Sequence, residues 1–211
     1  MVSNSMIIPM SIDTHPLQQK RHQVAKRTVD VCVSLLVLIL IFPLAYLIIG
    51  GLIKWKMPGK ILFKQQRTGK EGHPFVCYKF RSMLPSNEAD TMQAHDDDPR
   101  ITPLGRFLRI TSLDEIPQFW NVLRGEMSIV GPRPHMLLHT EYYSRLIPCY
   151  EQRLAIKPGI TGWAQIHNLR GETHNSEKMR QRVEHDVWYI RHWTMGLDLR
   201  IMFRTIRVMF N

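Results

Sequence analysis

The stretch VCVSLLVLILIFPLAYLIIGGLI, from Val31 to Ile53, decides how this chain is organised, because none of its 23 residues is charged. As a helix it would be roughly 34 Å long at about 1.5 Å per residue, against a hydrocarbon core of about 30 Å. The stretch is too long for a secretory signal, and no small-residue cleavage site follows it. It therefore predicts a membrane-embedded segment.

The flanks and the middle of this stretch argue against a simple crossing. Basic residues stand on both sides of it: Lys20, Arg21, Lys26 and Arg27 before, and Lys54, Lys56, Lys60, Lys64 and Arg67 after. Because basic flanks stay cytoplasmic, a crossing should have only one of them. Pro43 lacks an N–H and crowds the carbonyl of Ile39, so it kinks or breaks the helix. We predict a re-entrant helix-break-helix hairpin over residues 23–56, with a kinked full span as the alternative.

Composition sets bounds on the partners of the chain. Its 211 residues suffice for one sizeable core, and a net charge of +10 with a pI near 9.8 favours an anionic partner. Nucleic acid, anionic membrane lipids and phosphorylated substrates all meet that description. Cys32, Cys77 and Cys149 share no metal-binding spacing, which indicates reduced thiols in a cytosol-facing protein.

Outside the apolar stretch, the pattern predicts a mobile leader over residues 1–22 and a single α-rich α/β domain over residues 57–211. Within that domain we expect a β-hairpin from strands 61–66 and 75–80, an exposed helix and loop over 84–100, and helices over 136–154 and 176–191. Residues 157–163 read as a loop. Ser112 and Glu115 have the spacing of a capping box, although Pro117 places the true helix start a few residues later.

The C-terminal residues 199–211 form a basic amphipathic helix in which Arg200, Arg204 and Arg207 make one stripe. Such a helix suits a bilayer interface with its arginines among anionic headgroups. Trp188, Tyr189 and Trp193 just upstream are typical of an interfacial aromatic belt. A core helix with a solvated arginine edge is the alternative.

Asp114 and Glu115 are the residues most capable of chemistry. Adjacent helical residues point about 100° apart, so the two carboxylates cannot oppose each other as in a glycosidase. They can share one Mg²⁺, or one can be a nucleophile and the other a metal ligand. Amides at a helix start favour an ionised carboxylate there. In the alternative reading, Glu115 is only a helix cap and Asp114 a first-turn acid.

Cationic side chains surround this pair in the sequence. They are Lys79 and Arg81 after the second strand, Arg109 five residues before Asp114, and Arg133 between Pro132 and Pro134. Flanking prolines restrict the backbone, which suits a guanidinium that must meet phosphate oxygens with two donors. The combination predicts phosphate chemistry with a divalent metal at a membrane surface.

Several motifs together resemble those of the bacterial sugar transferases, the monotopic polyprenyl-phosphate sugar-1-phosphate transferases. They are KFRSM (79–83), DPRITPLGR (98–106), TSLDEIPQ (111–118), GPRP (131–134) and KPGITGWAQ (157–165), in the order of the family. The resemblance covers residues 24–211, and the chain looks like the minimal catalytic form. One departure is Phe42, where some relatives have serine before the helix-breaking proline.

The resemblance implies a phosphoglycosyl transferase at the cytoplasmic face of the bacterial inner membrane, acting in the first membrane step of glycan assembly. It would move a sugar-1-phosphate from a UDP-sugar to undecaprenyl phosphate and release UMP. Asp114 would be the nucleophile that forms an aspartyl phosphosugar, Glu115 would bind Mg²⁺, and Arg133 would hold phosphate. Lys79 and Arg109 match positively charged active-site positions, and Asp186 and Gln165 are weaker candidates.

Two functions from other classes compete with this interpretation. A non-catalytic membrane adaptor could bind anionic lipid or a partner transferase through its basic face, but the acidic pair with Arg133 argues against it. A nucleic-acid binder is disfavoured by the apolar stretch. His135 and His139 lack a third zinc ligand, and Asp96, Asp97 and Asp98 read as a solvated acidic loop. The sequence leaves the sugar, the glycan pathway and the oligomeric state open.

Overall fold

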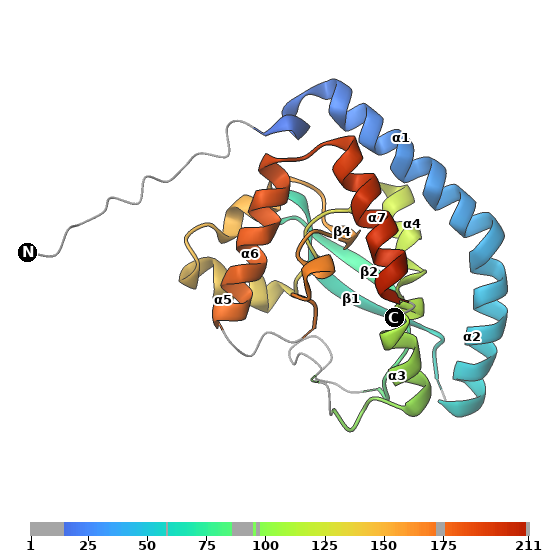
Figure 1. Cartoon of the computed structure of the whole chain (residues 1–211). Coiled ribbons are helices and arrows are strands. Elements are labelled where there is room, and N and C mark those ends of the chain that lie inside the picture. The colour runs from blue at the N-terminus through green and yellow to red at the C-terminus, as the bar shows by residue number, and fades with distance from the viewer. Residues whose placement is uncertain (1–14, 58, 86–94, 96–97, 172–175, 210–211) are drawn as a thin grey trace, which may run out of the picture.

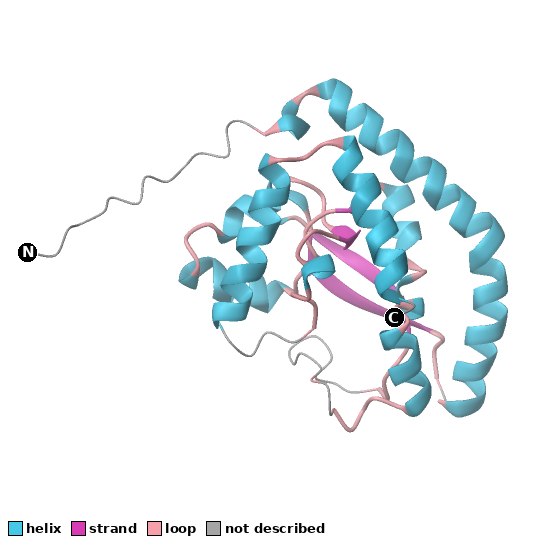
Figure 2. Ribbon diagram, in the orientation of Figure 1, coloured by secondary structure: helices cyan, strands magenta, loops and turns pink. Residues whose placement is uncertain are grey.

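The computed structural model of the chain describes residues 15–57, 59–85, 95, 98–171 and 176–209. Most of these residues are helical, and the helices surround two small sheets of two strands each (Figure 2). The main elements are α1 (Lys20–Leu36), α2 (Phe42–Lys56), β1 (Leu62–Thr68), β2 (Pro74–Phe80), α3 (Pro103–Ile110), α4 (Gln118–Arg124), β3 (Ser128–Val130), α5 (Leu137–Leu146), β4 (Gly159–Thr161), α6 (Ser176–Arg191) and α7 (Met195–Met209). The prediction of an α-rich α/β domain is confirmed at this level.

The apolar stretch forms two helical arms joined by one π-helical turn, Val37–Ile41. Together they make a helical segment of 37 residues, Lys20–Lys56, which is long and apolar enough to cross a membrane by length and composition. Pro43 is the second residue of α2, and the N–H of Phe42 bonds to the carbonyl of Val37, five residues earlier. The wide turn thus accommodates a proline that cannot join the ordinary bonding pattern. Figure 1 shows the arms curving around one side of the domain.

The arm before the turn docks through polar contacts. Lys26 forms an ion pair of 2.5 Å with Asp198 of α7, and Arg27 donates to the carbonyls of Val122 and Leu123 at the end of α4. Asp30 accepts from the backbone N–H of Ile129 in β3 at 2.9 Å. Two residues of the predicted basic flank are therefore bound to the domain itself.

The arm after the turn docks through apolar contacts. Ile49, Ile53 and Met57 are buried in one cluster with Phe80 of β2 and Leu108 of α3. On the face away from the domain, large side chains are left exposed in both arms and in the turn: Leu36, Ile39, Leu40, Leu44, Leu47 and Ile48. Leu47, for example, is 72% exposed. One body therefore contacts both ends of a segment whose middle presents an apolar outer face.

Two small sheets organise the domain. β1 and β2 pair antiparallel, with Leu62 opposite Phe80 and Thr68 opposite Pro74, so the predicted hairpin is confirmed. β3 and β4 pair in parallel, although residues 157–163 were expected to be a loop. This pairing depends on glycine, because a Cβ on Gly159 would lie 2.1 Å from the backbone nitrogen of Gly131. Sequence periodicity cannot detect a strand of three residues.

The remaining predicted elements have mixed outcomes. The helix over 176–191 is confirmed as α6. The helix expected over 136–154 is wrong in length, because α5 ends at Leu146 before Pro148 and a 3₁₀ helix, Tyr150–Ala155, follows. Most of the helix and loop expected over 84–100 lies outside the described residues. The three cysteines are free thiols, as expected.

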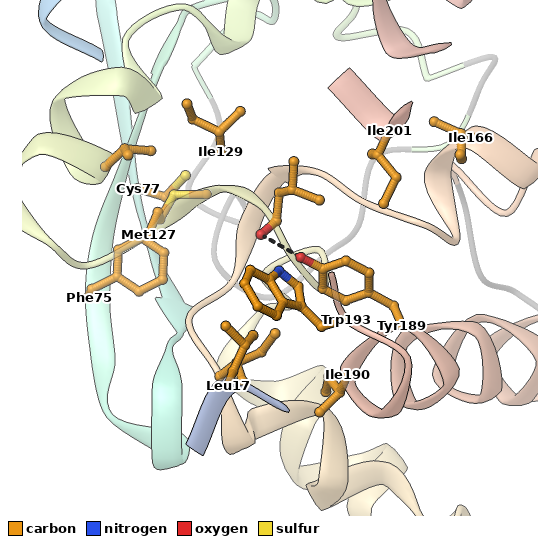
Figure 3. Packing of buried hydrophobic residues seen from close by; sticks show 13 residues of the cluster. Leu17, Phe75, Cys77, Met127, Ile129, Ile166, Tyr189, Ile190, Trp193 and Ile201 are labelled. Carbon is orange, nitrogen blue, oxygen red and sulfur yellow. Dashed lines mark hydrogen bonds between the residues drawn. The ribbon is translucent and has the colours of Figure 1, made fainter. Parts of the chain in front are cut away.

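The largest core cluster lies under α6 and α7, and Figure 3 shows its interior. Tyr189 and Trp193 are 1% and 3% exposed there, so placing them in an interfacial belt was wrong. Both bind Asp198: the Tyr189 hydroxyl donates to its carboxylate at 2.6 Å and the indole N–H of Trp193 at 3.0 Å. Their polar ends are therefore satisfied inside the protein, and Trp188 alone of the three is exposed.

Helix α7 packs into the core through one face, as the alternative interpretation of the C-terminus expected, and the interfacial interpretation stays a prediction. Ile201 is fully buried in the core, and the hydroxyl of Thr205 contacts that of Thr161 in β4 at 2.6 Å. The opposite face exposes an apolar strip beside the arginine stripe: Leu199, Phe203 and Ile206 next to Arg200, Arg204 and Arg207.

Candidate active site at the Asp114-Glu115 pair

The acidic pair lies in a short 3₁₀ turn, Leu113–Glu115, between α3 and α4. Ser112 enters this turn with φ +56°, and its hydroxyl has no hydrogen-bond partner among the described residues. The predicted capping box is therefore wrong, since a capping serine needs an extended backbone. Helix α4 begins after Pro117, as expected, and ends at Gly125 with φ +82°. The turn leaves both carboxylates pointing into the domain rather than along a helix surface.

Close packing fixes the elements on either side of the pair. A Cβ on Gly105 of α3 would lie 1.7 Å from the Ser82 carbonyl oxygen, so only glycine allows α3 to approach the chain after β2. The fully buried Asn121 of α4 donates to the Val76 carbonyl and accepts from the Tyr78 N–H of β2. These contacts set β2 against α4, and Lys79 follows directly.

Two of the predicted cations meet the acidic pair. Lys79 Nζ lies 2.7 Å from Glu115 Oε1 and 4.0 Å from Asp114 Oδ2. The Arg133 guanidinium, from the loop after β3, donates to the same Glu115 Oε1 at 2.8 Å. Asp114 Oδ1 is buried and has no hydrogen-bond partner among the described residues. One carboxylate is thus held by two cations, and the other keeps an oxygen unpaired.

The surroundings therefore shift the pKa values of the two acids in opposite directions. Burial favours the protonated form of both, and it raises the pKa of Asp114 despite the attraction of Lys79. For Glu115, burial also acts upward, but Arg133, Lys79 and Arg170 outweigh it and hold the pKa well below its usual value. Glu115 is a fixed anion, whereas Asp114 gains from any additional positive charge that enters the site.

Two further arginines approach this centre. Arg109 of α3 donates to the thioether sulfur of Met83 at 3.2 Å, which is a weak acceptor. Arg170, which the sequence analysis did not single out, lies half-buried near both carboxylates and donates to the Arg109 carbonyl at 3.5 Å. Its position in an irregular loop gives no periodic signal, so only the tertiary structure brings it here. Within the described residues, neither guanidinium has a carboxylate at ion-pair distance.

The other candidate residues have structural contacts. The Arg81 guanidinium donates to the Met57 carbonyl at the end of α2, at 2.5 Å. Asp186 forms a buried ion pair of 2.8 Å with Arg153, which in turn donates to the Arg133 carbonyl at 2.6 Å. Gln165 donates to the Ile160 carbonyl at 3.1 Å. Asp186 thus acts on the backbone of Arg133 through Arg153.

Among the described residues, the acidic pair is the candidate for holding a metal ion. No group of three or more histidine, cysteine or acidic side chains gathers among the described residues. His135 is buried with its Nδ1 2.6 Å from the Tyr150 hydroxyl, while the ring of His139 makes an edge-to-face contact with Tyr143, so the two histidines have separate partners. The unpaired Asp114 oxygen beside Glu115 fits Mg²⁺, a cation that usually takes one or two carboxylates and completes its shell with substrate phosphates and water.

Comparison with known proteins identifies the family of this chain. The family model described as "Bacterial sugar transferase" matches residues 21–211, and the chain belongs to that family. It is 49% identical over 186 residues to "UDP-glucose:undecaprenyl-phosphate glucose-1-phosphate transferase" of Escherichia coli (strain K12), covering 88% of this chain and 40% of the relative. The chain therefore spans less than half of that relative's length.

Two other relatives are matched over more of their own length. A protein of the same name from Caulobacter vibrioides is 45% identical, with 90% of this chain and 72% of the relative covered. "Exopolysaccharide production protein PSS" of Rhizobium leguminosarum bv. phaseoli is 43% identical, with 87% and 94% covered. The family resemblance seen in the sequence motifs is confirmed.

Proposed function

We propose that this protein is a phosphoglycosyl transferase that moves a sugar-1-phosphate from a UDP-sugar to undecaprenyl phosphate and releases UMP. The observation that carries the proposal is the buried Asp114, which has an unpaired oxygen beside Lys79 and beside a Glu115 held by two cations. A pyrophosphate donor and a phosphate acceptor can share a site only if cations offset their charge. The site provides an excess of positive charge, since four cationic side chains lie around the two carboxylates: Lys79, Arg109, Arg133 and Arg170.

In the proposed mechanism Asp114 is the nucleophile. One carboxylate oxygen attacks the phosphorus that bears the sugar, the bond from that phosphorus to the bridging oxygen breaks, and UMP leaves with the electron pair. An oxygen of the lipid phosphate then attacks the same phosphorus and displaces the Asp114 carboxylate. The product is undecaprenyl diphosphate sugar, and Asp114 returns to its starting state.

We assign Glu115 and Asp114 as the protein ligands of Mg²⁺. When bound, the ion would offset negative charge on the donor phosphates. Lys79 and Arg133 keep Glu115 ionised and in place. Arg109, whose only described side-chain contact is a thioether, can turn to phosphate at little cost.

We propose that the apolar segment is re-entrant and that the protein is monotopic at the cytoplasmic face of the inner membrane. Polar contacts hold α1 and apolar contacts hold α2 to one body, which favours both ends lying on the same side of the bilayer. The apolar outer face of the turn would enter the lipid. A straight span would separate the two docked ends.

Exposed apolar side chains near the pair support a site at the membrane surface. Phe107 and Ile110 of α3 and Trp120 of α4 are 56%, 69% and 48% exposed, and they flank the acidic turn in the sequence. With the amphipathic face of α7, they suit an interface of anionic lipids. Figure 1 shows α3 beside the end of α2, and Leu108 of α3 shares a buried cluster with Ile49 and Ile53 of α2. A lipid phosphate at headgroup level could reach Asp114 there.

The test is UMP release from a panel of UDP-sugars with undecaprenyl phosphate. UDP-glucose, UDP-galactose and UDP-N-acetylgalactosamine come first, since relatives are named for these sugars or their phosphates. We expect Mg²⁺-dependent release that Asp114→Asn abolishes, and a mass increase on Asp114 equal to that of the sugar-1-phosphate less one water when the acceptor is omitted. Arg180→Gln, at an exposed site on α6, is the matched control.

Turnover that persists without Asp114 would refute the covalent step. The non-catalytic adaptor makes a different forecast: lipid binding without UMP release from any donor, in the wild-type protein as well as in Asp114→Asn.

A further inference from the structure

Arg182 of α6 makes contacts that the mechanism above does not use. It is 3% exposed, and its guanidinium donates from Nε to the Leu169 carbonyl and from Nη2 to the Gly171 carbonyl, both at 2.9 Å. These two carbonyls flank Arg170. One side chain therefore holds the backbone on both sides of the arginine that lies near the acidic pair.

The Leu169–Gly171 loop has a specific backbone conformation and a backbone hydrogen bond at its start. Asn168, just before it, has φ +60°, and Gly171 at its end has φ +87°. The N–H of Leu169 bonds to the Ala164 carbonyl at 3.1 Å. The 3₁₀ helix Gln165–His167 thus anchors the start of the loop, and Arg182 anchors the rest.

The charge of Arg182 is unusual for such a contact. Within the described residues it has no carboxylate at ion-pair distance, and its two bonds go to neutral carbonyls. Burial, together with Arg133 and Arg153, lowers its pKa to about 10, so it remains protonated at neutral pH. Burying a cation costs folding free energy unless partners compensate. The buried Arg182 fixes the loop through these two hydrogen bonds and adds positive electrostatic potential beside the site.

Arg170 is the residue that this loop presents. It is half-buried and feels both carboxylates, with Glu115 the stronger influence, while Arg133 and Arg109 repel it. A guanidinium in this position, without an ion pair of its own, is suited to an incoming anion. Repulsion from the neighbouring arginines would be relieved when phosphate binds.

We propose that Arg182 is a positioning residue that holds the Leu169–Gly171 loop so that Arg170 binds the diphosphate of the nucleotide donor. The inference rests on the proposed function, because it takes a nucleoside diphosphate to be the donor's anionic part. It assigns substrate binding to a loop that presents no periodic motif, and it gives the buried charge of Arg182 a role.

The experiment measures binding of UDP with Mg²⁺ to the full-length protein in nanodiscs by calorimetry. We expect Arg182→Gln and Arg170→Ala each to raise the Kd about tenfold, in the range of a lost charged hydrogen bond. If Arg182 acts through Arg170, the double variant binds no more weakly than Arg170→Ala alone. Arg180→Gln, two residues away on the exposed side of α6, should bind as the wild type does.

If the increase in Kd of the double variant equals the product of the two single increases, Arg182 acts independently of Arg170 and the proposal is overturned. Arg170→Ala leaves the contacts of Arg182 in place, so it keeps the wild-type melting temperature and tests the loop even if Arg182→Gln does not fold. An unchanged Kd for Arg170→Ala also overturns the proposal.

The two proposals can fail separately. A wild-type protein that binds UDP but releases no UMP would refute the proposed function and leave the loop assignment standing. If the wild-type protein releases UMP and Arg170→Ala binds UDP with the wild-type Kd, only the loop assignment is refuted.

Discussion

At the residue scale, the site separates two neighbouring carboxylates by their surroundings. Glu115 has two cationic partners within 2.8 Å, whereas Asp114 is buried with one oxygen unpaired. Adjacent residues of the same charge type are thus prepared for different roles. Glu115 is stabilised as an anion before any substrate arrives, and Asp114 is not.

This difference predicts that Asp114→Asn and Glu115→Gln shift stability in opposite directions. The raised pKa of Asp114 means that its ionised form destabilises the fold above its unfolded pKa, so Asp114→Asn should melt above the wild type at pH 7. That advantage should shrink as pH falls toward about 4, where the wild-type acid protonates too. Glu115→Gln should melt below the wild type, because Lys79 and Arg133 lose their anionic partner. The expected loss in the free energy of unfolding is about 1–3 kcal/mol.

Thermal melts of both variants at pH 7 and at pH 4.5 provide the measurement. The lowered pKa of Glu115 implies that its contribution persists down to the lower pH, so the Glu115→Gln deficit should remain there. Equal melting temperatures for the two variants at pH 7 would show that the environments do not differ as described.

Asp186 gives a second prediction at this scale. It and Arg153 are both 2% exposed as side chains, so Asp186→Asn leaves a buried cation without its partner. We expect a loss of about 3–5 kcal/mol in stability, seen as a lower melting temperature. Glu184→Gln, exposed on the same helix, is the control and should be neutral. A stable Asp186→Asn that lacks only activity would instead place Asp186 in the chemistry.

At the scale of elements, the π-helical turn before Pro43 decides the direction of α2. Pro43→Ala restores an N–H that can bond to the Ile39 carbonyl, so the segment can straighten. A straight helix cannot keep Lys26 on Asp198 and Ile53 against Phe80 together. We expect the melting temperature to fall by several degrees, on the order of 1–2 kcal/mol. Leu47→Ala, on the exposed face, should leave it unchanged, and matching melts for the two variants would contradict this view.

At the scale of the whole molecule, docking of both arms predicts the topology. In a background lacking the native cysteines, Gln19→Cys and Glu71→Cys place single thiols at exposed positions on either side of the apolar segment. Both should resist an impermeant thiol reagent applied outside intact cells, and both should react after permeabilisation. Labelling of one position alone from outside would establish a span.

The sequence by itself determined the family, the apolar segment, the β-hairpin of β1 and β2, and α6. These features rest on local signals: uncharged length, strand alternation, helical periodicity and contiguous motifs. It also named Lys79 and Arg133 next to the acidic pair, because both stand in distinctive motifs. Local chemistry of this kind is readable without knowledge of distant contacts.

Only the tertiary structure decided which side chains meet. Ser112 does not cap a helix, Tyr189 and Trp193 are buried, and β3 pairs with β4 through close glycine contacts. Arg170 lies close enough to Glu115 and Asp114 to interact with both, whereas Arg81 bonds to the Met57 carbonyl. The physical reason is that burial and long-range electrostatics depend on packing between segments far apart in the chain. An arginine in a sequence shows a charge, but only the fold selects its partner.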